Sequence, residues 1–280
     1  MELLSEWNQT NAIPPWSDAE LRHKLREAAK SVRQAGYLLA HNAPSLLCHP
    51  PALRPTPTPD EAARKAAQRQ QWPAFRLGTE TELRSLASLR RIHPGIPWLA
   101  QKEGLLMFTT SPTGEDCYGF TEGTMAQVRR MDGQPFTSSD GKNVKSRNLP
   151  GSVGSWLGYA ILERHPNAPV LVGEGLVSWM EVMEALTRAG AWNWRPFAAL
   201  SASVHLGERE LSLLRGRQII IARDRAEAGA AAAIRWQQQL ATVNTTARIW
   251  TPPLPCKDLG ELLTTDPNAT LQFATKSNPS

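Results

Sequence analysis

The stretch that decides the fold is Val170-Leu-Val-Gly-Glu-Gly175, in which a short apolar run ends in a glycine and an acid. A similar order of apolar run, acid and small residues returns in Ile219-Ile-Ile-Ala-Arg-Asp-Arg-Ala-Glu-Ala-Gly229. Short continuous apolar runs bounded by turn residues are typical of strands that are buried on both faces, as in a parallel sheet. Each of the two runs therefore predicts a buried strand that is followed by a helix.

The residues around these two runs alternate between apolar runs and helical periodicity. Strands are predicted at 170–172, 197–200, 218–222 and 247–250, and helices at 176–189, 208–214 and 226–240. Strands that alternate with helices build βαβ units, whose strands lie parallel. We therefore predict the α/β fold class for residues 169–265, with a parallel sheet flanked by helices, followed by a flexible tail at 266–280.

The part of the chain before residue 169 follows other patterns. Apolar residues at helical spacing predict a helix at 17–33, within an N-terminal helical segment of residues 1–43. Residues 44–59 are rich in proline and predict an extended linker. Residues 60–168 are expected to form a small basic α+β subdomain. Its predicted helices are 60–71 and 79–91, and past Pro94 we expect only short strands and turns, among them 105–109, 117–120 and 125–131.

Positive charge is concentrated in the first half of the 280-residue chain. The formal net charge is +5, but residues 22–147 hold 19 Lys and Arg against 11 Asp and Glu, whereas residues 148–280 hold 12 against 11. A basic stretch beside a balanced domain indicates a surface that binds phosphate groups. The alternative is a solvated basic face without a ligand.

Several protein classes are disfavoured by what the sequence lacks. The three cysteines, Cys48, Cys117 and Cys256, lie far apart without a CxxC pair, so neither a disulfide scaffold nor a zinc ribbon is expected. The segment Met1–Trp7 has neither the basic head nor the apolar run of a signal peptide, and no long apolar window is present. There is also no GxxxxGK[ST] loop, so a fused P-loop helicase is not expected. These features predict a cytoplasmic protein without a membrane partner.

Two acids stand directly after predicted strands of the parallel sheet, Glu174 and Asp224. An open α/β sheet binds its ligands just beyond the carboxyl ends of its strands. Carboxylates brought together there suit Mg²⁺, which keeps several waters and bridges to phosphates. The alternative is that each acid caps the helix that follows it.

These segments together resemble the Toprim domain shared by primases and topoisomerases. The resemblance rests on Gly173-Glu-Gly175, on the Asp-x-x-x-Ala-Gly order of Asp224–Gly229 and on the closing Lys257-Asp-Leu-Gly-Glu-Leu-Leu263. It is closest to primase-like proteins of phages, plasmids and other mobile elements. The resemblance implies that Glu174 and Asp224 bind a divalent metal, Mg²⁺ or Mn²⁺, for phosphoryl transfer.

The basic stretch upstream extends this resemblance, which spans about residues 105–265. The segments Gly123-Thr-Met-Ala-Gln-Val-Arg-Arg-Met-Asp-Gly133, Lys145-Ser-Arg-Asn-Leu-Pro-Gly-Ser152 and Trp156-Leu-Gly158 are similar to the small subdomain that precedes the Toprim domain in primase catalytic cores. The resemblance implies that Arg129, Arg130 and Lys145 contact the template and the incoming nucleotide. Lys257, in the closing segment, is a further candidate for nucleic-acid or nucleotide binding.

The sequence departs from the Toprim pattern at two positions. Ala226 stands where the family has the second aspartate of its Asp-x-Asp pair, and Ser178 stands where related proteins often have another acid. Alanine cannot bind metal, so weaker Mg²⁺ binding is expected. Glu227, in the first turn of its predicted helix, and Asp258, in the final loop, are candidates to complete the metal site.

The sequence thus predicts a DNA primase-type nucleotidyltransferase of the mobile-element kind, which makes primers on single-stranded DNA with a divalent metal. The expected partners are single-stranded DNA and nucleotides, with a separate helicase or zinc-binding primase module. Ala226 motivates an alternative, a catalytically degenerate Toprim protein that binds DNA or RNA as a replication accessory. A Toprim-type nuclease is a third possibility.

Overall fold

The computed structural model describes residues 16–29, 58–137, 141–266 and 269, and the chain divides into two compact units, residues 1–54 and 55–280. In the first unit, α2 (Asp18–Ala29) begins after Ser17. The backbone N–H of Ser17 donates to Glu20 Oε2 at 2.8 Å, and Glu20 N–H donates back to Ser17 Oγ at 3.4 Å. This reciprocal cap fixes the predicted helix start. The predicted extension to residue 33 lies outside the described residues.

The second unit begins with α3 (Pro59–Gln70), whose first residue is a proline and whose cap is Thr58. Proline suits this position because the first N–H groups of a helix have no partner inside it. Of the predicted linker at 44–59, only these two residues lie within the described part. The predicted helix at 79–91 is found as α4 (Glu80–Arg90), which begins with a capping box of Thr79 and Glu82.

One helix of this region was not predicted. Residues after Pro94 were expected to form only strands and turns, but α5 (Gly95–Lys102) follows at once. The expectation was wrong, because Gly95 and Pro97 both stand in the first turn of α5, where they interrupt no hydrogen bond. Ile96 and Ala100 of α5 are buried in the core.

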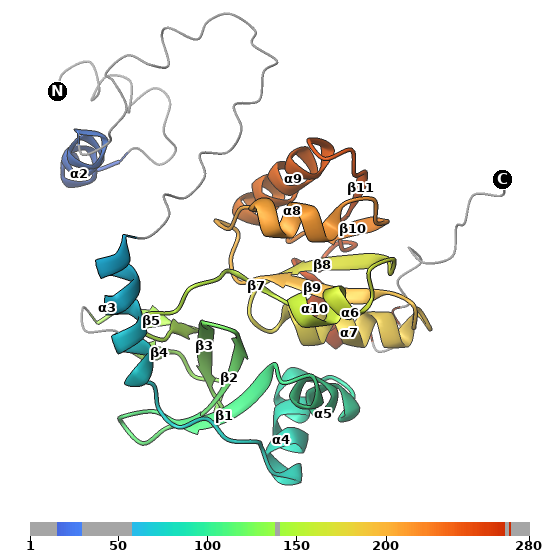
Figure 1. Cartoon of the computed structure of the whole chain (residues 1–280), viewed down its shortest axis with the longest axis horizontal. Helices are drawn as coiled ribbons and strands as arrows, with labels where there is room; N and C mark the ends of the chain where they lie inside the picture. The colour runs from blue at the N-terminus through green and yellow to red at the C-terminus, as the bar shows by residue number, and fades with distance from the viewer. Residues whose placement is uncertain (1–15, 30–57, 138–140, 267–268, 270–280) are drawn as a thin grey trace, which may run out of the picture. The chain divides into compact units, whose positions relative to one another are not determined.

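An antiparallel sheet follows, with the strand order β1-β2-β3-β6. Its strands are β1 (Leu106–Thr110), β2 (Asp116–Glu122), β3 (Met125–Arg130) and β6 (Arg147–Asn148), while β4 (Phe136–Thr137) and β5 (Asn143–Val144) form a separate pair. In the β2–β3 register Tyr118 faces Arg129. The antiparallel sheet lies beside the parallel sheet of the same unit (Figure 1), and both residues line the cleft described below.

The parallel sheet confirms the predicted α/β class. Its order is β11-β10-β8-β9-β7, and its strands are β7 (Trp156–Leu157), β8 (Val170–Glu174), β9 (Arg195–Ala199), β10 (Ile219–Ala222) and β11 (Ala247–Trp250). The helices are α6 (Tyr159–Arg164), α7 (Ser178–Arg188), α8 (Glu208–Leu214), α9 (Glu227–Ala241) and α10 (Leu259–Thr265). Only β7 runs antiparallel to its neighbour, and it comes from residues expected to belong to the basic subdomain.

The order of the strands creates a switch point in the parallel sheet. The chain moves from β8 to β9 on one side, then crosses to β10 on the other side of β8 and continues outward to β11. The pairs Ile219↔Val170 and Ile221↔Val172 fix the register of β10 against β8. A crevice forms where the strand order reverses, because the connections leave the two strand ends in opposite directions.

The two sheets share one hydrophobic core. Buried residues of the antiparallel part, such as Leu86 and Phe120, lie in the same cluster as Trp179 and Met180 of α7. Buried apolar surface of this kind is the main source of stability and fixes one sheet against the other. None of the described helices is long and apolar enough to cross a membrane.

Candidate active site

A cleft of about 1000 Å³ opens where the ends of β8 and β10 face the antiparallel sheet. Its acidic side chains come from the parallel sheet and the helices after it, and its basic side chains come mainly from α4 and the β3–β5 region. The acids are Glu174, Glu181, Asp224, Asp258 and Glu261, and the cations are Arg90, Arg91, Arg129, Arg130, Lys145 and Lys257. The cleft therefore coincides with the switch point and carries opposite charges on its two walls.

Glu174 and Asp224 approach each other because the residue packed against both is a glycine. A Cβ atom added to Gly229, in the first turn of α9, would lie 3.0 Å from Glu174 Oε2 and 2.7 Å from Asp224 Cβ. No side chain larger than hydrogen fits that space without moving one of the carboxylates. Gly229, the last residue of the Asp-x-x-x-Ala-Gly segment, thus has a packing role at the strand ends.

The electrostatic environment of the two acids is unfavourable for their charge. The pKa of Asp224 rises to about 7, first through burial and then through repulsion by Glu174, Asp258 and Glu181. Burial also raises the pKa of Glu174, against the opposing effects of a backbone hydrogen bond at Ala202 and the charge of Arg235. Carboxylates that repel one another in a desolvated cleft favour a proton or a cation between them.

The two candidates to complete the metal site lie in different surroundings. Asp258 lines the cleft, but it is also the N-cap of α10, where its Oδ1 accepts from Glu261 N–H at 2.7 Å. Its Oδ2 lies 4.0 Å from Lys257 Nζ. Glu227 is exposed and does not line the cleft, because it is the first residue of α9 and follows the exposed cap residue Ala226.

The chemistry of the donor set permits a metal site of two carboxylates. Within the described ranges, no group of three or more His, Cys, Asp or Glu side chains is placed to hold a metal ion. Mg²⁺ is often bound by one or two carboxylates, with waters and substrate phosphates supplying the other ligands. Glu174 and Asp224 fit Mg²⁺ or Mn²⁺ in this way, and not as part of a four-residue set with Glu227 and Asp258.

Ser178 does not supply an additional ligand from α7. Its Oγ donates to the carbonyl oxygen of Glu174, at the end of β8, and lies 3.4 Å from Glu181 Oε2. The hydroxyl therefore braces the strand end that carries Glu174. Neither Ala226 nor Ser178 therefore offers a carboxylate to a metal ion.

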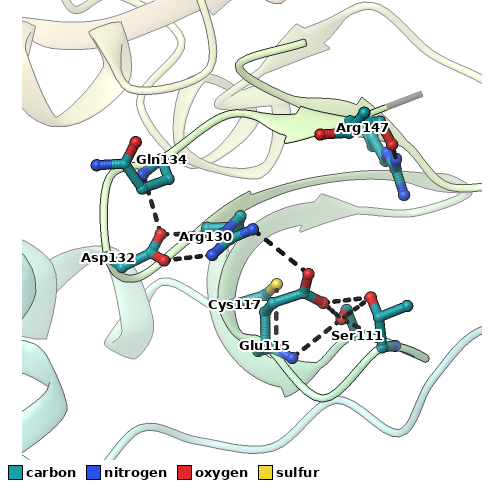
Figure 2. Close-up of polar contacts among 9 residues, drawn as sticks. Ser111, Glu115, Cys117, Arg130, Asp132, Gln134 and Arg147 are labelled. Atoms are coloured by element: carbon teal, nitrogen blue, oxygen red, sulfur yellow. Dashed lines mark hydrogen bonds and ion pairs between the residues drawn. The ribbon is translucent and has the colours of Figure 1, made fainter. Parts of the chain in front are cut away.

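The predicted basic residues differ in how free their charges are. Arg130 is held by Asp132, to which its Nε donates at 3.0 Å, and its Nη1 lies 3.4 Å from Glu115 Oε1 (Figure 2). Lys145 and Lys257 are exposed and line the cleft. Arg129 is partly buried, and its Nε has no hydrogen-bond partner. Arg130, which the sequence analysis names together with Arg129, is thus already paired with two acids inside the protein.

The cleft residues that the sequence analysis did not single out include Arg90, Tyr118 and Glu181. Arg90 ends α4, where a basic residue is common and carries no functional signal. Glu181 stands among apolar residues of α7, and Tyr118 is one of several apolar residues of β2. No local pattern distinguishes them, because the elements that bring them together, α4, β2 and α7, come from distant parts of the chain.

Comparisons with known proteins found similar chains among solved structures. No protein-family model and no curated protein matches the chain. The chain is similar to the primase fragment of the bacteriophage T7 primase-helicase protein, with 20% identity over 72% of this chain and 81% of that one and a TM-score of 0.44. It is also similar to the RNA polymerase domain of the Mycobacterium tuberculosis primase DnaG, with 16% identity over 76% and 82% of the two chains and a TM-score of 0.43. These similarities concern the arrangement of the chain and assign no role to a residue of the cleft.

Proposed function

We propose that this chain is a primase-like nucleic-acid enzyme that makes primers on single-stranded DNA by metal-dependent nucleotidyl transfer. The observation that carries the proposal is the convergence of Glu174 and Asp224 at the switch point of the parallel sheet, opposite a basic wall in the same cleft. Ligands of open α/β sheets bind at such a point. A cleft with acids on one side and cations on the other suits a nucleotide whose phosphates carry a metal ion.

In the proposed reaction the 3′-hydroxyl oxygen of a primer end attacks the α-phosphorus of a nucleoside triphosphate. The new P–O bond forms as the bond to the β-phosphate oxygen breaks, pyrophosphate leaves, and the hydroxyl proton passes to solvent. Glu174 and Asp224 would hold Mg²⁺, which when bound lowers the pKa of the attacking hydroxyl and offsets the charge of the leaving group. Lys145 and Arg129 would position the phosphates, since fixed cations favour the charge that develops there.

The test is primer synthesis by the purified chain with single-stranded DNA, nucleoside triphosphates and Mg²⁺ or Mn²⁺. We expect Glu174→Gln to lower product formation by about 100-fold or more, because it removes one of two metal ligands. Glu208→Gln is a matched control, since Glu208 is an exposed acid in the first turn of α8. An active Glu174→Gln variant, or a wild-type chain that binds DNA and makes no product, would contradict the proposal.

A second candidate function is suggested by Ala226. Its methyl group stands where a further carboxylate would be expected, and it is exposed at the start of α9. A protein with the remaining two acids could bind DNA or RNA as a replication accessory without catalysis. This reading predicts binding that weakens with salt, does not require metal and is not accompanied by product. Nicking of plasmid DNA would instead indicate a nuclease.

A further inference from the structure

Arg90 is a cation of the cleft with an internal partner. It is the last residue of α4, its side chain is 25% exposed, and its Nη2 donates to Glu181 Oε1 at 2.7 Å. Glu181 lies on α7 with 12% of its side chain exposed. The ion pair therefore joins the basic wall to the acidic wall inside the cleft.

Two arginines of the cleft have side-chain N–H donors without a hydrogen-bond partner. The Nε atoms of Arg90 and Arg129 are both buried, and neither has a hydrogen-bond partner. Buried N–H donors are nearly always paired in folded proteins, so two such donors lining one cleft call for an acceptor that is not a side chain of the described residues. Arginine presents its donors as a planar fork, which suits phosphate oxygens.

Tyr118 shows that these two arginines face the same place. Tyr118 lies opposite Arg129 in the β2–β3 register and lines the cleft with Arg90. Burial raises the pKa of Tyr118, while the charges of Arg90 and Arg129 and a hydrogen bond with Arg129 oppose that rise. Both guanidinium charges therefore act on the hydroxyl of Tyr118, which lines the same cleft.

We propose that Arg90 and Arg129 form an anion site for the triphosphate group of a nucleotide, and that Glu181 is the resting partner which Arg90 exchanges for phosphate. The identification of the anion as a nucleotide triphosphate rests on the function proposed above. Arg130 is unsuited to this role because Asp132 and Glu115 already hold it. Glu181, by contrast, holds Arg90 through one oxygen, which leaves the other donors of Arg90 available.

Glu181 is itself confined, so the exchange depends on Arg90. A Cβ atom added to Gly260 of α10 would lie 2.6 Å from Glu181 Oε1, which shows how closely α10 packs against this carboxylate. The free guanidinium donors of Arg90 can turn toward a ligand while Glu181 stays in place. The carboxylate then competes with phosphate for the same cation, and its removal should strengthen phosphate binding.

The experiment is calorimetric titration of the full chain with sodium tripolyphosphate in EDTA, so that no metal takes part. We expect Arg90→Gln to weaken binding by about tenfold or more and Arg90→Lys to restore part of it, since lysine keeps the charge but not the fork. Glu181→Gln should tighten binding severalfold. Arg84→Gln is the control, because Arg84 lies on the same helix in an exposed pair with Glu80.

Exchange of Arg90 between Glu181 and phosphate predicts opposite signs for the two variants of the pair. Equal weakening by Arg90→Gln and Glu181→Gln would show that the pair is a structural brace, and would overturn the proposal. Unchanged binding by Arg90→Gln, or no binding by the wild-type chain, would overturn it as well. If Arg90→Gln does not fold, as judged by thermal melting, the sign for Glu181→Gln decides. Because no metal, template or product is involved, this outcome is independent of the primer-synthesis test.

Discussion

The carboxylates at the switch point and the carboxylate at the start of α4 are perturbed in opposite directions. Burial and like charges raise the pKa of Asp224 to about 7, whereas hydrogen bonds from Arg76 and Thr79 lower the pKa of Glu82 to about 2. Glu82 accepts from Arg76 Nη1 at 2.8 Å and from Thr79 N–H at 2.8 Å. No ion pair of Glu174 or Asp224 occurs in the described part of the chain.

The difference separates structural acids from acids that await a ligand. Glu82 has its partners inside the protein, so its charge stabilises the fold. The charges of Glu174 and Asp224 oppose folding unless a cation joins them, which proteins tolerate chiefly at functional sites. The predictions that follow test this distinction.

The largest effect is expected for Gly229→Ala. The new Cβ would press on Asp224 Cβ and Glu174 Oε2, so the two carboxylates would separate. Primer synthesis should fall by about 100-fold, although alanine is the better helix former by about 1 kcal/mol. Ala231→Ser, at an exposed position of the same helix, is the control. Full activity of Gly229→Ala would mean that the close approach of the acids is not needed.

A smaller effect is expected for the stability of Asp224→Asn without metal. Removal of a desolvated charge that Glu174 repels should raise the free energy of unfolding at pH 8 by about 1–2 kcal/mol. Urea denaturation in EDTA measures it, with Glu208→Gln as the exposed control. A destabilised Asp224→Asn would show that this carboxylate is a structural acid like Glu82.

The smallest effect is expected for Glu82→Gln, and it has the opposite sign. The folded pKa lies below the ordinary glutamate value of 4.5, so the ionised form of Glu82 stabilises the fold above about pH 4.5, and this contribution is lost as the pH falls toward 2. At pH 7 the variant should lose about 1 kcal/mol, since a capping interaction and a partly exposed ion pair are removed.

Thermal melting between pH 2 and pH 7 checks this dependence. The difference between wild type and Glu82→Gln should shrink below pH 4.5. Glu80→Gln is the matched control, because Glu80 is an exposed acid in the same turn whose partner is also an arginine. A pH-independent difference would assign the effect to packing and not to charge.

Much of the fold could be predicted because local sequence patterns determine its strands and helices. The apolar run at 170–172 became β8, since a continuous apolar run can be buried on both faces. The helix that was not predicted, α5, has a proline in its first turn, and proline inside a helical pattern usually ends a helix. The antiparallel β7 strand was missed because two residues carry no periodicity.

The candidate site was only partly accessible to sequence reasoning. Glu174 and Asp224 could be singled out because each follows an apolar strand directly, and both line the cleft. Glu227 directly follows Ala226 and, like it, is exposed, so its side chain does not line the cleft. Arg90 and Glu181 are separated by 91 residues, and only packing brings them together.

The sequence by itself determined the strands, most helices and the acids at the strand ends, because these depend on the order of neighbouring residues. The tertiary structure decided which charges are neutralised. Arg129 and Arg130 are adjacent in the chain, yet only Arg130 is held by two acids, and among the acids Glu82 is satisfied while Asp224 is not. The energy of a charge depends on burial and on partners brought from distant segments, which no local pattern encodes.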